Sequence, residues 1–275
     1  MWKDILVHCD GGEAGRRRLE YAAALAGQFQ ARLTGLHVIP PVEVPPVYRV
    51  GDVEAVDDRI GYSNERDAEF ARANFEEITK QKSLPCRWYG TEGDIVEHLC
   101  EHSRYTDLLI LGQYASAGTA EKHPLPLATS VVVRCGRPIL IVPSEWAELP
   151  TETNILVAWD GSREAVRAVH DAIPLMRTAK SITVLTVSPE HDKQSLGAKE
   201  TQLLLDHFQQ YGLNLVPELV ASDREHASIG DRLDPKRFQI LVMGAYGRSR
   251  WFEFIFGGMT QSAMLSAPLP VLLSH

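Results

Sequence analysis

An internal repeat constrains the fold of this chain more than any other feature. Ile5-Leu-Val-His-Cys-Asp-Gly reappears 150 residues later as Ile155-Leu-Val-Ala-Trp-Asp-Gly. Leu108-Leu-Ile-Leu-Gly and Arg137-Pro-Ile-Leu-Ile-Val reappear 132 residues later as Ile240-Leu-Val-Met-Gly and Leu269-Pro-Val-Leu-Leu-Ser. The chain is therefore two copies of one unit. The first copy is longer by the difference between these offsets, 18 residues.

The additional residues fall between Pro40 and Gly61. Four prolines lie in this stretch: Pro40, Pro41, Pro45 and Pro46. Proline lacks a backbone N–H and disfavours regular helix. We therefore expect a long surface loop between Pro40 and Gly61.

Short apolar runs alternate with amphipathic stretches in both copies. The predicted strands are 4–9, 33–38, 85–89, 107–112 and 138–142, then 154–159, 181–187, 215–220, 238–243 and 270–274. The predicted helices are 14–28, 63–82, 92–103 and 123–135, then 163–177, 195–211, 226–234 and 258–266. Wholly apolar strands such as Ile139-Leu-Ile-Val are typical of parallel strands covered on both faces. The alternation predicts an α/β fold of two doubly wound domains, each with five parallel strands and helices on both faces.

The repeat also predicts the domain boundaries. We expect one domain at 1–143, a linker at 144–153 with Trp146 as its anchor, and a second domain at 154–275. An apolar last strand needs cover, so the two copies are expected to pack together through their last strands. A homodimer of the tandem chain is a further possibility.

Charge and cysteine usage exclude several classes of partner. The net charge of −8 disfavours nonspecific binding to nucleic acid or an anionic membrane. No apolar run is long enough to span a bilayer, and charges interrupt the first ten residues where a signal peptide would be apolar. The four scattered cysteines fit reduced, mostly buried thiols. We therefore expect a cytoplasmic protein.

A glycine-rich stretch follows the fourth predicted strand of the second copy. Gly244 ends the apolar run, and Thr260 opens a segment of helical composition. Between them lie Gly247, Gly257 and Gly258. Glycines let backbone N–H groups approach an anion closely, and a helix N-terminus completes such a site. The stretch indicates a phosphate-binding loop; the alternative is a tight turn with a helix C-cap glycine.

Ligands of doubly wound sheets bind beyond the carboxyl ends of the strands, where the strand order reverses. The loop Asp160-Gly161-Ser162 should meet the glycine-rich stretch there. Asp160 would then accept a hydrogen bond from a ribose hydroxyl or from nearby backbone. The alternative is that Asp160 and Ser162 cap the following helix.

These features together resemble the universal stress protein family in its tandem form. The residues that carry the resemblance are Ile155-Leu-Val-Ala-Trp-Asp-Gly-Ser, the spacing Gly244-x2-Gly247-x9-Gly257, and Ala267-Pro-Leu-Pro-Val-Leu-Leu. The resemblance covers essentially the whole chain. It implies two Rossmann-like domains with ATP, with or without Mg²⁺, bound in the second domain only.

The resemblance also implies roles for individual residues. Ala158 and Asp160 would line the base and ribose, with Val187 against the adenine. The phosphates would be surrounded by Gly244, Gly247, Arg248, Gly257, Gly258 and Thr260. ATP-binding members have Ser or Thr where this chain has Gly258, so one hydroxyl contact is missing, and Thr260 can compensate. Taken alone, Arg248 is equally a solvated loop charge, and Val187 is better explained by core packing.

The first copy departs from this pattern. At the equivalent positions it has His8 for Ala158 and, in the loop, Ala115, Leu125, Pro126 and Ala128. Proline removes an amide donor and leucine fills space. We therefore expect no ATP in the family manner there. His8 is interpreted as a buried histidine rather than a metal ligand with Cys9, because adjacent strand residues face opposite ways. His98 and His102, four apart on a predicted helix, are interpreted as a solvated face.

No catalytic motif of the common kinds is present, and no catalytic residue is assigned. The leading hypothesis is a stress-response protein that binds an adenine nucleotide in its second domain as a regulatory ligand, with at most weak ATP hydrolysis. The alternatives are a scaffold that binds no nucleotide and, on fold analogy alone, a slow ATPase or kinase-like enzyme.

Overall fold

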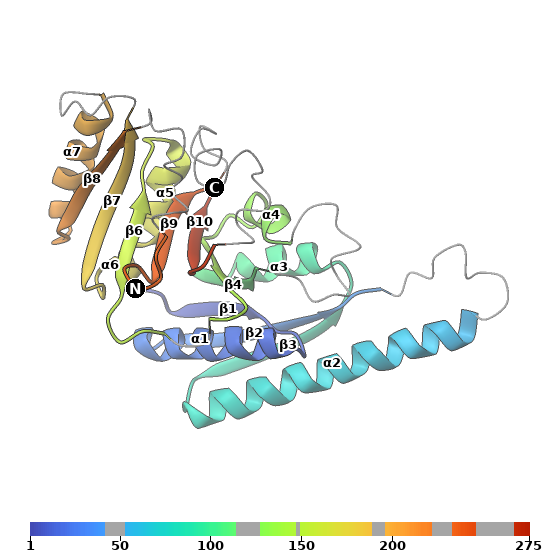
Figure 1. Ribbon diagram of the computed structural model, residues 1–275. Helices are drawn as coiled ribbons and strands as arrows, with labels where there is room; N and C mark the ends of the chain where they lie inside the picture. The colour runs from blue at the N-terminus through green and yellow to red at the C-terminus, as the bar shows by residue number, and fades with distance from the viewer. Residues whose placement is uncertain (42–52, 114–126, 147–148, 189–195, 222–232, 246–266) are drawn as a thin grey trace.

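A single ten-stranded sheet runs through the computed structural model and joins the two repeats (Figure 1). The structure describes residues 1–41, 53–113, 127–146, 149–188, 196–221, 233–245 and 267–275. The strand order is β3-β2-β1-β4-β5-β10-β9-β6-β7-β8. Each half pairs its own five strands in parallel, and the halves meet where β5 and β10 pair antiparallel.

All ten predicted strands are present. Their bounds are β1 Asp4–His8, β2 Arg32–Ile39, β3 Cys86–Glu92, β4 Leu108–Gly112, β5 Ile139–Val142, β6 Asn154–Ala158, β7 Ser181–Ser188, β8 Leu215–Ala221, β9 Ile240–Gly244 and β10 Val271–Ser274. The predicted α/β class with two Rossmann-like domains is confirmed. Pro217 lies in β8, an edge strand, where a missing N–H is tolerated.

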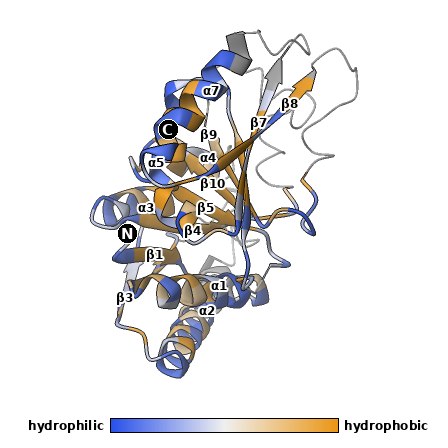
Figure 2. Cartoon of the chain, turned by 90° about the vertical axis from the view of Figure 1, so that its left-hand side faces the viewer, coloured by the Kyte–Doolittle hydropathy of each residue, from blue (hydrophilic) through white to orange (hydrophobic). Residues whose placement is uncertain are grey.

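Alternate residues of the central strands supply two separate hydrophobic cores, one on each face of the sheet. Ile5 and Val7 belong to the first core and Leu6 to the second, and Ile155, Val157 and Leu156 repeat this division. Figure 2 shows the apolar strands between helices whose outer sides are hydrophilic. A strand that is buried on both faces has a continuous run of apolar residues, and these runs made the strands predictable from the sequence.

Among the helices of the first repeat, α2 differs most from prediction, at its N-terminal end. Their bounds are α1 Glu13–Phe29, α2 Val53–Gln81, α3 Ile95–Ser103 and α4 Leu127–Val132. The expectation that the loop extends to Gly61 is wrong, because α2 begins at Val53. The four prolines end at Pro46, and Val53–Arg59 contains neither proline nor glycine, so nothing there prevents helix.

The helices of the second repeat are α5 Arg163–Asp171, α6 Ile173–Met176 and α7 Leu196–Gln209. The single helix predicted at 163–177 is therefore two. Pro174 has no N–H to donate to the preceding turn, and α5 ends before it. Most of the predicted helices 226–234 and 258–266 lies outside the described residues.

The last strands of the two repeats hold the halves together, as expected. Leu272 of β10 lies opposite Leu140 of β5, and both side chains are fully buried. Gln113 adds a link at the carboxyl end of β4, where its Nε2 donates to the Ala267 carbonyl oxygen at 2.6 Å. Trp146 packs against both cores, which supports its role as the anchor between the repeats.

Candidate functional site at the carboxyl ends of β6 and β9

The strand order of the second repeat reverses between β6 and β9. From β6 the chain continues to β7 on one side and later returns to β9 on the other. Val157 pairs with Val242, so the ends of these two strands, Ala158 and Gly244, lie at the same edge. This is the place where doubly wound sheets bind ligands. Ala158 is buried at this edge.

Helix α5 begins directly after this edge. Ser162 is its N-cap, and the Ser162 Oγ accepts a hydrogen bond from the Ala165 N–H at 3.2 Å. Asp160 Oδ1 accepts from the Ser162 N–H at 2.9 Å. The capping alternative is therefore realised for Ser162, and Asp160 accepts a hydrogen bond from nearby backbone. Asp160 Oδ2 has no hydrogen-bond partner among the described residues, so the carboxylate can still accept from a ligand.

Gly244 lies against the first turn of α5. A Cβ at Gly244 would come within 2.5 Å of the Ala165 backbone nitrogen and 2.6 Å of the Glu164 carbonyl carbon. Both are backbone atoms, so no side chain is tolerated without displacing the helix. Glycine at this position is thus explained by packing, and it brings the end of β9 directly beside the N-terminus of α5.

The remaining predicted residues are only partly visible. Val187 lies in β7 and its backbone pairs with Val220 of β8, two strands from β9 in the sheet. The rest of the predicted phosphate loop lies outside the described residues: Gly247, Arg248, Gly257, Gly258 and Thr260. Of the residues predicted to bind the nucleotide, the structure therefore describes Ala158, Asp160 and Gly244, together with the backbone of Val187.

The first repeat fills the equivalent place with its own charged side chains. Arg18 of α1 is 3% exposed, and its Nη2 donates to Asp10 Oδ2 at 2.6 Å. The Arg18 Nε also donates to the His8 carbonyl oxygen at 2.9 Å. Asp10 is therefore paired inside the protein. The second repeat has Ala168 at the position of Arg18, and no described residue of that repeat forms an ion pair with Asp160.

The ionisation of this buried group follows from its surroundings. The pKa of His8 is lowered to about 3, mainly by burial. The nearby Arg18 guanidinium also lowers this pKa, by more than Asp10 raises it. Burial alone would raise the pKa of Asp10, but Arg18, His8 and the Gly12 backbone N–H outweigh it, so the pKa is lowered. At neutral pH the first repeat thus contains a neutral imidazole and a closed ion pair.

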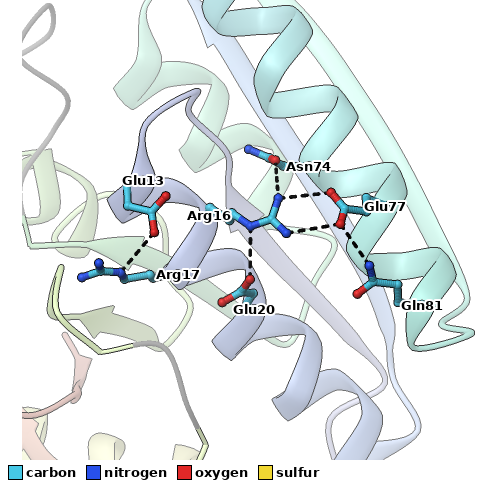
Figure 3. Close-up of polar contacts among 7 residues, drawn as sticks. All are labelled: Glu13, Arg16, Arg17, Glu20, Asn74, Glu77 and Gln81. Carbon is cyan, nitrogen blue, oxygen red and sulfur yellow. Dashed lines mark hydrogen bonds and ion pairs between the residues drawn. The ribbon is translucent and has the colours of Figure 1, made fainter.

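Helix α2 covers the same loop. A Cβ at Gly11 would lie 2.9 Å from the Cα of Asp67, so the backbone of α2 touches the end of the β1 loop. Figure 3 shows what holds α2 against α1: Arg16 donates to Asn74 Oδ1 at 2.8 Å and to both carboxylate oxygens of Glu77 at 3.1 and 3.3 Å. Glu20 of α1 forms a second ion pair with Arg16, with 3.3 Å between the Arg16 Nε and the Glu20 Oε1.

Other candidate sites have ordinary explanations. His98 contacts the Glu92 carbonyl oxygen at 3.1 Å, and His102 packs on Tyr89, so the two imidazoles have separate partners. Both are partly buried, so the solvated face expected of them is only half correct. Within the described ranges no three potential metal ligands come together, and no helix could cross a membrane. All four cysteines are free, and three are buried.

Comparison with known proteins decides the family. The model described as "Universal stress protein family" matches residues 1–143 and 152–275. The chain belongs to the universal stress protein family. A universal stress protein of Synechocystis sp., Slr1230, is 23% identical, and the match covers 98% of this chain and 99% of that protein. The structure of a universal stress protein from Archaeoglobus fulgidus superposes with a TM-score of 0.68 at 16% identity, over 98% of this chain and 95% of that one.

A shorter universal stress protein was solved in complex with cAMP. It covers 51% of this chain and 96% of its own length, with 19% identity and a TM-score of 0.38. That protein is described with an adenine nucleotide bound.

Two residues beside these sites were missed in the sequence. Arg18 stands opposite Ala168 at the same offset of 150 that relates the first strands, so extending the repeat into the helices would have found it. Glu200 of α7 lies against the Asp160-Gly161-Ser162 loop, 40 residues beyond Asp160. No motif marks Glu200, and only the folded chain brings it there.

Proposed function

We propose that this universal stress protein binds an adenine nucleotide, ATP with or without Mg²⁺, in its C-terminal domain, and that the nucleotide acts as a regulatory ligand. The observation that carries the proposal is the difference between two equivalent aspartates. Asp10 is paired with a buried arginine, whereas Asp160 lies at the sheet switch point with one carboxylate oxygen unpaired among the described residues.

The residues of the second repeat fit a nucleotide in three ways. Ala158 leaves room for a base where His8 would obstruct it. Asp160 is an acceptor for a ribose hydroxyl. The phosphates are assigned to the glycine-rich stretch from Gly244 to Thr260, with Arg248 as the cation. Val187 is assigned to the adenine.

The role is proposed to be regulatory because the sequence contains no catalytic motif of the common kinds. A cytoplasmic location is proposed because the four cysteines are free and three of them are buried. Binding would stabilise the folded C-terminal domain by mass action, which provides a way for the nucleotide to alter association with a protein partner or a second copy.

Calorimetric titration of the full-length protein with ATP tests the proposal. Binding that AMP competes with is expected, and Asp160→Ala should weaken it roughly tenfold by removing a hydrogen bond to a charged group. Asp160→Ala also removes the hydrogen bond from the Ser162 N–H, so the folded state of the variant is checked by circular dichroism.

Gly247→Leu is a second variant, which should abolish binding by filling the phosphate loop. The first-domain control is Ala115→Leu at the equivalent position, which should leave binding unchanged. Absence of heat with every adenine nucleotide would contradict the proposal and favour a scaffold that binds no nucleotide.

A further inference from the structure

A second carboxylate faces the loop that carries Asp160. Gly161 has φ +71°, and a Cβ built on it would lie 3.1 Å from Glu200 Oε2 and 3.9 Å from Oε1. The three nearest atoms to this position all belong to the Glu200 carboxyl group. Glu200 is exposed on the second turn of α7 and makes no ion pair with another described residue. Its carboxylate is therefore free to accept hydrogen bonds beside Asp160.

The first repeat shows that this arrangement is not imposed by the fold. There the backbone of α2 itself approaches the loop, with the Asp67 Cα and carbonyl oxygen 2.9 and 3.0 Å from a Cβ at Gly11. In the second repeat the three atoms nearest to the equivalent position at Gly161 are side-chain atoms of Glu200 rather than helix backbone. The two loops thus differ in what lies against them among the described residues: helix backbone in the first repeat and a carboxylate in the second.

The two carboxylates at this loop are suited to accept hydrogen bonds from hydroxyl groups. Asp160 and Glu200 are acceptors when ionised, and a ribose presents two adjacent hydroxyl groups. An acid located beyond the second strand commonly binds the ribose 2′-hydroxyl in dinucleotide-binding folds. Glu200 lies on the helix after β7, the second strand of its repeat, and β7 is hydrogen-bonded to β6.

Two carboxylates also orient the nucleotide. They repel phosphate, so the phosphates lie away from Glu200 and toward the end of β9. Gly244 is at that end, beside the N-terminus of α5, where backbone N–H groups and the helix dipole favour an anion.

We propose that Glu200 is a specificity-determining residue that, with Asp160, binds the ribose 2′- and 3′-hydroxyl groups and so selects ribonucleotides over deoxyribonucleotides. The proposal rests on the nucleotide function proposed above. The hydroxyl group that Glu200 binds is identified by the deoxynucleotide, 2′-deoxy-ATP or 3′-deoxy-ATP, whose affinity does not change in Glu200→Ala.

Titrations of the full-length protein with ATP, 2′-deoxy-ATP and 3′-deoxy-ATP test it. The unmodified protein should bind ATP about tenfold more tightly than at least one deoxy form, as expected for one hydrogen bond to a charged group. Glu200→Ala should weaken ATP binding about tenfold and leave that deoxy form unchanged, which removes the discrimination. Asp206→Ala is the matched control: it deletes an exposed acid from the same helix and should change neither affinity.

The outcomes separate the two proposals. If ATP binds and Glu200→Ala keeps the full preference for ribose, Glu200 has no such role, although the nucleotide function stands. Equal affinity of the unmodified protein for all three nucleotides also overturns the role of Glu200. If none of them binds, both proposals are wrong.

Discussion

His8 and Ala158 occupy one position of the repeat, yet their environments differ in charge and in space. His8 is held neutral among Arg18, Asp10 and His37. Arg18 binds the His8 carbonyl oxygen and the Asp10 carboxylate together, so a single side chain closes the first site. Removing either Arg18 or Asp10 would leave the other as an unpaired buried charge, which explains why both residues are present together.

His8 should make the protein sensitive to acid. Its pKa is about 3 in the folded protein against an ordinary value of 6.5, so between these values the unfolded chain binds one more proton. The stability from the neutral buried imidazole is complete above pH 6.5 and is lost as the pH falls toward 3. His8→Ala should therefore reduce the slope of unfolding free energy against pH by up to about 1.4 kcal/mol per pH unit.

Urea unfolding at several pH values between about 4 and 7, inside the window that these two pKa values set, measures this slope. His207→Ala, which removes an exposed histidine of α7, is the control for loss of an imidazole. A slope for His8→Ala equal to that of the unmodified protein would show that His8 is protonated in the folded state, which contradicts a neutral buried imidazole.

At the scale of elements, the first turn of α5 and the end of β9 are placed by direct backbone contact. Gly244→Ala puts a methyl group against two backbone atoms of α5. We expect it to destabilise the protein by about 1–3 kcal/mol, the usual effect of overpacking. It should also weaken ATP binding, because the helix N-terminus must move.

Gly27→Ala is the matched control for this substitution. Gly27 lies in α1, and the nearest atom to its added Cβ is Leu84 Cδ2 at 3.8 Å, an ordinary contact. The higher helix propensity of alanine should stabilise the protein by about 0.5–1 kcal/mol. Urea denaturation of both variants measures the difference; equal stability of Gly244→Ala and the unmodified protein would mean that the contact relaxes freely.

At the scale of the whole molecule, the continuous sheet makes the two repeats one cooperative unit. Leu272 and Leu140 are fully buried opposite each other across the antiparallel junction. Leu272→Ala should cost about 2–5 kcal/mol, as for other buried leucines. Both halves should lose stability together, because each edge of the junction is covered only by the other.

Scanning calorimetry shows whether the repeats unfold together. For Leu272→Ala we expect one transition, shifted to lower temperature. Val216→Ala on the edge strand β8, where Val216 is 58% exposed, should change stability by less than about 0.5 kcal/mol. Two separate transitions, of which only one moves in Leu272→Ala, would show that the repeats unfold independently.

The strands, their parallel order within each repeat and the pairing of the last strands were predictable from the sequence. Runs such as Ile139-Leu-Ile-Val and Ile155-Leu-Val-Ala can only be satisfied by burial on both faces of a sheet, and the repeat shows that the same solution is used twice. Local details were predicted less well: β3 extends to Glu92, and α2 begins eight residues before Gly61, because helix ends depend on weak local preferences.

The sequence by itself determined the duplicated α/β architecture, since a period of apolar runs and a repeated motif require no knowledge of distant contacts. Only the tertiary structure decided which charges meet. Arg18 lies on Asp10, and Glu200 reaches Gly161, across turns and helices that no spacing rule connects. The energy of a charge depends on its partner and its exposure to water, and both are properties of the folded chain.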